Sequence, residues 1–343
     1  MKIKFNTFDF LITNACDKRC SICCTNPHAM NEIQHLKFND FCGVVDCIEK
    51  YLEEKNETGN WGISGGEPFM YSDHEVGKNY TLVDIVEYLS TKKFINSVSI
   101  RTSGFDINSK QKLIFDALEK LRARKFITFT TSYNLFQKGD INERLKWILP
   151  IWLESQDNLE IQVIYNKSNY QKTLDGLNQL LKTANLLVDK SQTIKILQER
   201  LHKSNYYSWS IDGKRVDIKT YPAYSHGKID GEEFFEFKTA KCVSLSKADS
   251  NAVLVVNFDG TLHHCCNPYY SFKRRFFSPK IEGLLSGGIA LEDIANLFSD
   301  GMERVLLEPK IKYNLQRDYC DMCSVLLFGP VITAEGKFCE KPN

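Results

Sequence analysis

From residue 8 to about 221, short runs rich in β-branched and aromatic residues alternate with segments whose apolar residues repeat at helical spacing. This alternation is typical of repeated strand-helix units, in which the strands form a largely parallel sheet. Six such units predict an α/β fold, a partial (β/α)6 barrel of the TIM type. The predicted strands are Phe8 to Thr13, Asn60 to Ser64, Ser97 to Thr102, Ile127 to Thr131, Leu159 to Tyr165 and Val216 to Tyr221.

Four segments between these strands carry apolar residues along one side at helical spacing, and these sides are expected to cover the sheet. Asn39 or Asp40 is the predicted N-cap of the first helix, and Thr81 is the predicted N-cap of the second. The predicted helices are Phe41 to Leu52, Leu82 to Leu89, Ser109 to Leu121 and Tyr170 to Leu187.

The regular alternation ends after Tyr221. Val253 to Phe258 and Thr261 to Cys265 are β-rich runs separated by an Asp-Gly pair, which predicts a hairpin. A further helix is predicted around Leu291 to Phe298. We therefore expect a barrel over residues 1–237 and a small, metal-dependent second domain over residues 238–343.

Composition excludes several classes of protein. Lysine and arginine total 44 and aspartate and glutamate 43, so the formal charge of +1 gives no global field that would attract nucleic acid or a membrane. We find no signal peptide and no apolar run long enough to span a bilayer, so we expect a cytoplasmic protein. In a reducing compartment, metal sites explain twelve cysteines better than disulfides do.

The cysteines form two groups, one before residue 50 and one after residue 240. The first group contains Cys16-Asp-Lys-Arg-Cys20-Ser-Ile-Cys23, which places three thiols on a loop directly after the first predicted strand. Structural zinc usually takes four ligands, whereas an iron-sulfur cubane held by three thiolates leaves one iron open to another ligand. A zinc site completed by Cys24 or His28 is the alternative.

A second motif, Ile63-Ser-Gly-Gly-Glu-Pro68, lies at the end of the second predicted strand. Its paired glycines allow the backbone to approach a ligand closely, and its glutamate could accept a hydrogen bond from an ammonium group. Together, the three-cysteine loop and this segment resemble the radical S-adenosylmethionine (SAM) superfamily, over residues 8–221.

The resemblance implies a radical oxidoreductase. In that family the open iron of a [4Fe-4S] cluster binds SAM, and one electron cleaves SAM to methionine and a 5′-deoxyadenosyl radical, which abstracts hydrogen from the substrate. An electron donor such as flavodoxin or ferredoxin is implied as a partner. Cys16, Cys20 and Cys23 would hold the cluster. The residues expected to bind SAM are Ile22 near the adenine, Gly65, Gly66 and Glu67 at the methionine end, and Ser103 and Ser132 at the ends of the third and fourth strands.

Four thiols of the second group come from separate points: Cys242, Cys265, Cys320 and Cys323. Four thiolates can close either a zinc site or a [4Fe-4S] cluster, and their spacing does not choose between them. With Gly260-Thr-Leu-His-His-Cys265, the arrangement resembles the shortened SPASM, or twitch, extension, which implies one auxiliary [4Fe-4S] cluster.

Three residues near this second site have open roles. Cys266 is interpreted as a bystander, an alternative ligand, or a catalytic thiol that returns a hydrogen atom to a substrate radical. His263 and His264 could replace a thiolate ligand, although packing or surface roles are favoured.

By analogy with relatives, the expected substrate is a ribosomally synthesised peptide that is epimerised, cross-linked or oxidised. The alternative is a small-molecule dehydrogenase of the aminocyclitol type, which the absence of a leader-binding segment before the first strand favours. A non-catalytic zinc or electron-transfer protein is the alternative from another class.

Overall fold

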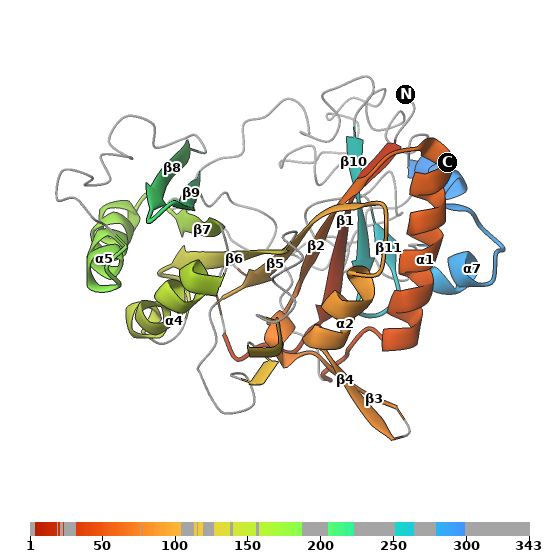
Figure 1. Cartoon of the computed structure of the whole chain (residues 1–343), viewed down its shortest axis with the longest axis horizontal. Coiled ribbons are helices and arrows are strands. Elements are labelled where there is room, and N and C mark those ends of the chain that lie inside the picture. The colour runs from red at the N-terminus through yellow and green to blue at the C-terminus, as the bar shows by residue number, and fades with distance from the viewer. Residues whose placement is uncertain are drawn as a thin grey trace, which may run out of the picture.

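The computed structural model describes residues 4–18, 20, 23, 32–75, 77–103, 113–114, 116–118, 127–137, 140–155, 158–186, 205–222, 251–263 and 279–298. Within these residues the main sheet has nine strands (Figure 1). In spatial order they are β11 (Leu262–His263), β10 (Asn251–Asn257), β1 (Lys4–Thr13), β2 (Gly59–Gly65), β5 (Ile95–Thr102), β6 (Ile127–Asn134), β7 (Asn158–Tyr165), β9 (Lys214–Pro222) and β8 (Asn205–Ile211).

All six predicted strands are present, as β1, β2, β5, β6, β7 and β9, and each is parallel to the next. The prediction of a mostly parallel α/β sheet of the partial-barrel type is therefore confirmed. Only the edge strands β8 and β11 pair in the antiparallel direction within the described sheet.

The predicted hairpin is present, and its first strand also joins the main sheet. β10 turns at Asp259 and Gly260 into β11, and Gly260 has a φ of +76°, which glycine adopts without strain. On its other side β10 pairs with β1 in parallel, so residues 251–263 extend the barrel sheet. The division into two domains stays a prediction, because residues 223–250 and 299–343 lie outside the described part of the chain.

The two faces of the sheet differ in chemistry. Phe10 of β1 packs against Phe41 of α1 (Phe38–Lys55), with ring centroids 4.9 Å apart, and Phe129 of β6 packs against Trp152 of α4 (Ile141–Ser155) at 5.8 Å. These aromatic residues mark the helix-covered face, which is apolar. The alternate residues point the opposite way, and we call their side the inner face of the sheet.

Four helices flank the sheet in Figure 1: α1, α2 (Leu82–Leu89), α4 and α5 (Tyr170–Thr183). The Thr81 N-cap is confirmed, because Thr81 and Asp84 form a capping box at the start of α2. The prediction for α1 was wrong: Lys37 occupies its N-cap position, and Asn39 and Asp40 lie inside the helix.

Other elements depart from the predictions. The α4 helix was missed, since Pro150 within it reads as a helix breaker. The α5 helix ends at Thr183, before the predicted Leu187. Of the predicted helix at 109–121, residues 113–114 and 116–118 are described and helical, and residues 291–298 are helical as predicted.

The described residues also contain a small hairpin and a short helix outside the main sheet. A small hairpin of β3 (Ser72–Glu75) and β4 (Lys78–Thr81) projects from the sheet, and α7 (Ile281–Leu285) lies beside α1 (Figure 1). None of the helices in the described ranges is both long and apolar enough to cross a membrane.

Candidate cofactor site at the carboxyl ends of the strands

The three-cysteine loop begins directly after Thr13, the last residue of β1, and therefore at the carboxyl end of the parallel strands. Cys16, Cys20 and Cys23 are all half-buried. The Cys16 Sγ accepts a hydrogen bond from the Lys18 backbone N–H (3.4 Å), and the Cys23 N–H donates to the Cys20 carbonyl (3.2 Å). These bonds turn the loop back on itself.

Burial raises the pKa of Cys16 to about 12 and that of Cys20 to about 11. Repulsion from Cys23 adds to both shifts. Partly desolvated thiols of this kind are poor free thiolates but good ligands, because a bound cation stabilises the charge that burial penalises.

No three His, Cys, Asp or Glu side chains in the described ranges are close enough together to hold a single metal ion. A four-iron cluster separates its ligand sulfurs more widely than a single ion does. Cys24 and His28, the residues that would complete the zinc alternative, lie outside the described part of the chain.

The Gly-Gly-Glu-Pro segment packs on the backbone of this loop. The Gly66 N–H donates to the Thr13 carbonyl (2.6 Å), and the Glu67 N–H donates to the Ala15 carbonyl (2.7 Å). A Cβ at Gly65 would lie 2.3 Å from the Thr13 carbonyl oxygen, and one at Gly66 would lie 2.1 Å from that of Ala15. Both glycines are thus needed for contact between the end of β2 and the segment that enters the cysteine loop.

The Glu67 side chain is fully buried and points toward the end of β5. Its carboxylate accepts hydrogen bonds from the Thr102 hydroxyl (2.7 Å), from the Ser103 N–H (3.0 Å) and hydroxyl (2.8 Å), and from the Phe69 N–H (3.4 Å). The sequence suggested an ammonium ligand as its partner. In the structure this carboxylate holds Ser103 beside the Gly-Gly-Glu-Pro segment, and its contact with SAM stays a prediction.

Burial raises the pKa of Glu67 above its usual 4.5, although hydrogen bonds from Thr102 and Ser103 act in the opposite direction. Above pH 4.5 the folded chain then holds a proton that the unfolded chain has lost, so stability falls as the pH rises through the folded pKa. We expect the stability advantage of the wild type over Glu67→Gln, which cannot titrate, to shrink across this window. Urea unfolding of both cluster-free proteins at several pH values measures the difference, and an advantage that grows with pH would contradict the raised pKa.

The remaining predicted cofactor contacts are only partly described. Ser132 is half-buried on the inner face of β6, in register with Gln162 of β7. His263 is fully buried and its Nε2 lies 3.1 Å from the Thr261 hydroxyl, consistent with a packing role. The other predicted residues lie outside the described part of the chain: Ile22, Cys242, Cys265, Cys266, Cys320, Cys323 and His264.

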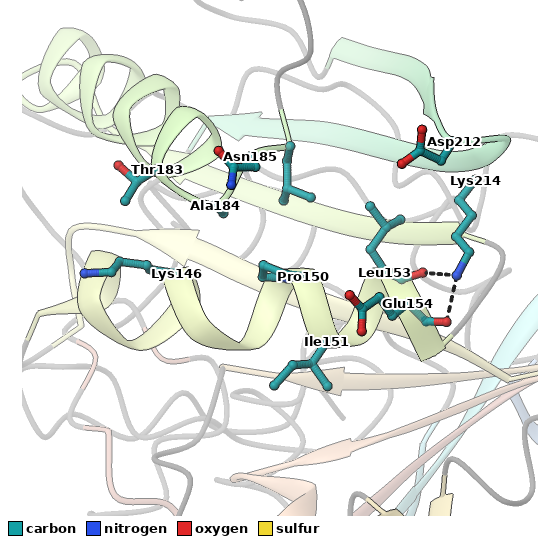
Figure 2. A pocket seen from close by; sticks show the side chains of 11 residues that line it. Lys146, Pro150, Ile151, Leu153, Glu154, Thr183, Ala184, Asn185, Asp212 and Lys214 are labelled. Carbon is teal, nitrogen blue, oxygen red and sulfur yellow. Dashed lines mark hydrogen bonds between the residues drawn. The ribbon is translucent and has the colours of Figure 1, made fainter.

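A cavity of about 670 Å³ opens elsewhere, between α4, the end of α5 and the turn that precedes β9 (Figure 2). The Lys214 ammonium at its rim donates to the Leu153 (2.9 Å) and Glu154 (2.7 Å) carbonyls. Because Lys214 is the first residue of β9, the cavity lies at the amino ends of the strands, away from the cysteine loop. None of the predicted site residues lines it.

The ion pairs of the inner face were not predicted from the sequence. Arg101 of β5 forms an ion pair with Asp9 of β1 (2.9 Å), across Gly62 of β2. Glu160 of β7 pairs with Lys219 of β9. Polar residues at every second position of strands that are otherwise apolar were the available signal, because fully covered parallel strands are apolar on both faces.

Comparison with known proteins reveals similarity of structure but not of sequence: no protein-family model and no curated protein matches the chain. The solved structure of native anSMEcpe with bound AdoMet matches over 95% of this chain and 88% of that chain, with a TM-score of 0.50 and 12% identity. HydG, a maturase of the [FeFe]-hydrogenase, is matched over 55% of this chain with a TM-score of 0.38 and 16% identity, and the match spans only 40% of HydG. Both proteins are radical SAM enzymes. The anSMEcpe match shows that this chain shares the fold of that enzyme, a mostly parallel α/β sheet of the partial-barrel type.

Proposed function

We propose that the chain is a radical SAM enzyme that holds one [4Fe-4S] cluster on Cys16, Cys20 and Cys23. The observation that carries this proposal is the packing of the Gly-Gly-Glu-Pro segment on the loop, through Gly66 to Thr13 and Glu67 to Ala15. That contact brings the loop with the three thiols and a glycine backbone together at the carboxyl ends of the strands, where barrels of this type place their sites.

In this proposal the chain's own residues bind the cluster and SAM and position the side chains around them. The three thiolates fit a cluster that keeps one iron open, and Gly65 and Gly66 keep the backbone beside them free of side chains. Glu67 holds Ser103 at the end of β5, so that Ser103 can meet the polar part of a ligand. A reduced cluster held by these thiolates would supply the electron for cleavage of SAM, and SAM would supply the 5′-deoxyadenosyl group for hydrogen abstraction from the substrate.

Finer assignments rest on analogy with the superfamily. We propose an oxidoreductase that modifies a ribosomally synthesised peptide in the cytoplasm, with a flavodoxin or ferredoxin as electron donor. A small-molecule dehydrogenase is the alternative. We further propose an auxiliary [4Fe-4S] cluster on Cys242, Cys265, Cys320 and Cys323, and Cys266 as the candidate thiol beside it.

Reconstitution tests the reaction. The full chain is loaded anaerobically with iron and sulfide, reduced with dithionite and given SAM, and 5′-deoxyadenosine is separated by chromatography while iron is counted in the same sample. We expect 5′-deoxyadenosine together with about eight irons per chain, the content of two four-iron clusters. Product formation with only about four irons per chain would contradict the auxiliary cluster and leave the enzymatic proposal standing. A loaded cluster without 5′-deoxyadenosine would overturn the enzymatic proposal.

A further inference from the structure

The inner face of β7 and β9 carries a patch of polar side chains, formed by Glu160, Gln162, Asp217 and Lys219. On the same two strands, the buried residues of the helix-covered face are apolar, as Ile161 is, except for Thr220. Strands buried on both faces of a parallel sheet are normally apolar throughout. This patch therefore marks a wall that meets a polar molecule or solvent, in contrast to the closed core beneath the helices.

Strand register arranges the patch in two rows. Glu160 is level with Asp217, and Gln162 is level with Lys219. The second row lies closer to the carboxyl ends of the strands, and Ser132 of β6 is level with Gln162 in that row. Ile164 is level with Tyr221 one row further toward those ends, and the row of Gln162 and Lys219 lies between that apolar row and the carboxylates of Glu160 and Asp217.

Hydrogen bonds and an ion pair connect the two rows of the patch. The Glu160 carboxylate accepts from the Lys219 ammonium and from the Gln162 amide (2.8 Å). The cation is the exposed partner: 35% of the Lys219 side chain is accessible, against 15% of Glu160. The Arg101–Asp9 pair on the same face has the same character, with 42% and 14% accessible, and Arg215–Asp217 follows it. In each of these pairs the cation is thus the more exposed partner.

We propose that Lys219, supported by Gln162, binds an anionic oxygen group of the substrate, a carboxylate or a phosphate. A lysine ammonium is a compact charge that suits such groups, and charge-assisted hydrogen bonds are among the strong ones. The inference rests on the proposed function in one respect. Ser132 is one of the expected SAM contacts, and Gln162 and Lys219 lie in the same row. A substrate anion bound by Lys219 would therefore lie beside SAM.

Calorimetric titration of the reconstituted protein with succinate and with inorganic phosphate tests the anchor. We expect Lys219→Gln to weaken binding at least about tenfold, the effect of one charge-assisted hydrogen bond. Glu160→Gln removes the charge behind the ammonium and keeps the size of the side chain, so it should tighten binding. Lys146→Gln is the matched control, because it removes a lysine that pairs with Glu143 on α4, on the helix-covered side. It should leave binding unchanged.

The source of the anion is separated by a third probe, an N-acetylated, C-amidated Ala-Glu-Ala peptide. Lys219-dependent binding of this peptide alone identifies an acidic side chain of a peptide as the ligand, whereas binding of succinate or phosphate identifies a free small molecule. The proposal is overturned if none of the three probes binds, or if Lys219→Gln binds them as the wild type does. Formation of 5′-deoxyadenosine is measured in the same samples without probe, so failure of the proposed function is recognised separately.

Discussion

Cys20→Ala should abolish formation of 5′-deoxyadenosine and remove about four irons per chain, the content of one cluster. Three thiolates are the smallest set that holds a cubane while leaving one iron open, and with two the remaining irons are exposed to solvent and lost. Cys20 is half-buried beside Cys23, whose repulsion contributes to its raised pKa. Iron content, the visible absorbance of the cluster and product chromatography together measure the effect.

Cys47→Ala is the matched control for that variant. Cys47 is also a half-buried free cysteine with a raised pKa, but it lies in α1, with its sulfur 3.9 Å from the Leu284 carbonyl. It should keep both iron and activity. Product formation by Cys20→Ala at the wild-type rate would reject the three-cysteine loop as the cluster site, and loss of a single zinc ion instead of iron would establish the zinc alternative.

Gly65→Ala should lower the free energy of unfolding by about 4 kcal/mol, from backbone strain and overpacking of about 2 kcal/mol each. Gly65 has a φ of +127°, which side chains rarely adopt, and its Cβ would collide with the Thr13 carbonyl. Because Thr13 leads into the cysteine loop, the variant should also bind less iron. Denaturant midpoints of the cluster-free proteins and iron content after reconstitution measure the two effects.

Substitutions at two other glycines separate the cost of backbone strain from the cost of steric overlap. Gly66→Ala meets the Ala15 carbonyl without a positive φ, so overpacking alone should cost about 2 kcal/mol. Gly77→Ala has a φ of +83° but open space around it, so strain alone should cost about 1 kcal/mol, with normal iron binding. Loss of iron in Gly77→Ala equal to that in Gly65→Ala would show that packing against the loop is not what these glycines provide.

Elements were predictable where the determining residues are neighbours in the chain. The six strands follow from runs of β-branched and aromatic residues, and the start of α2 follows from Thr81 and Asp84, which are three residues apart. The predicted N-cap of α1 was wrong because the residue that caps this helix is distant in the sequence. The acceptor that receives the Phe38 N–H is Asp73, which comes from β3 and lies 35 residues further along the chain (2.7 Å). The α4 helix was not predicted because Pro150 disfavours a helix locally. The packing of Trp152 on Phe129 of the sheet, by contrast, joins residues far apart in the sequence.

The sequence by itself determined the six parallel strands in their order, the hairpin at Gly260 and the two motifs of the candidate site, because side-chain period and motif spacing depend only on nearby residues. Tertiary structure alone decided that Glu67 bonds to Thr102 and Ser103, and that Gln162 and Lys219 share a row with Ser132. These contacts join residues 30 or more positions apart. Which side chains meet there depends on strand register, and register is set when the whole sheet packs against its helices.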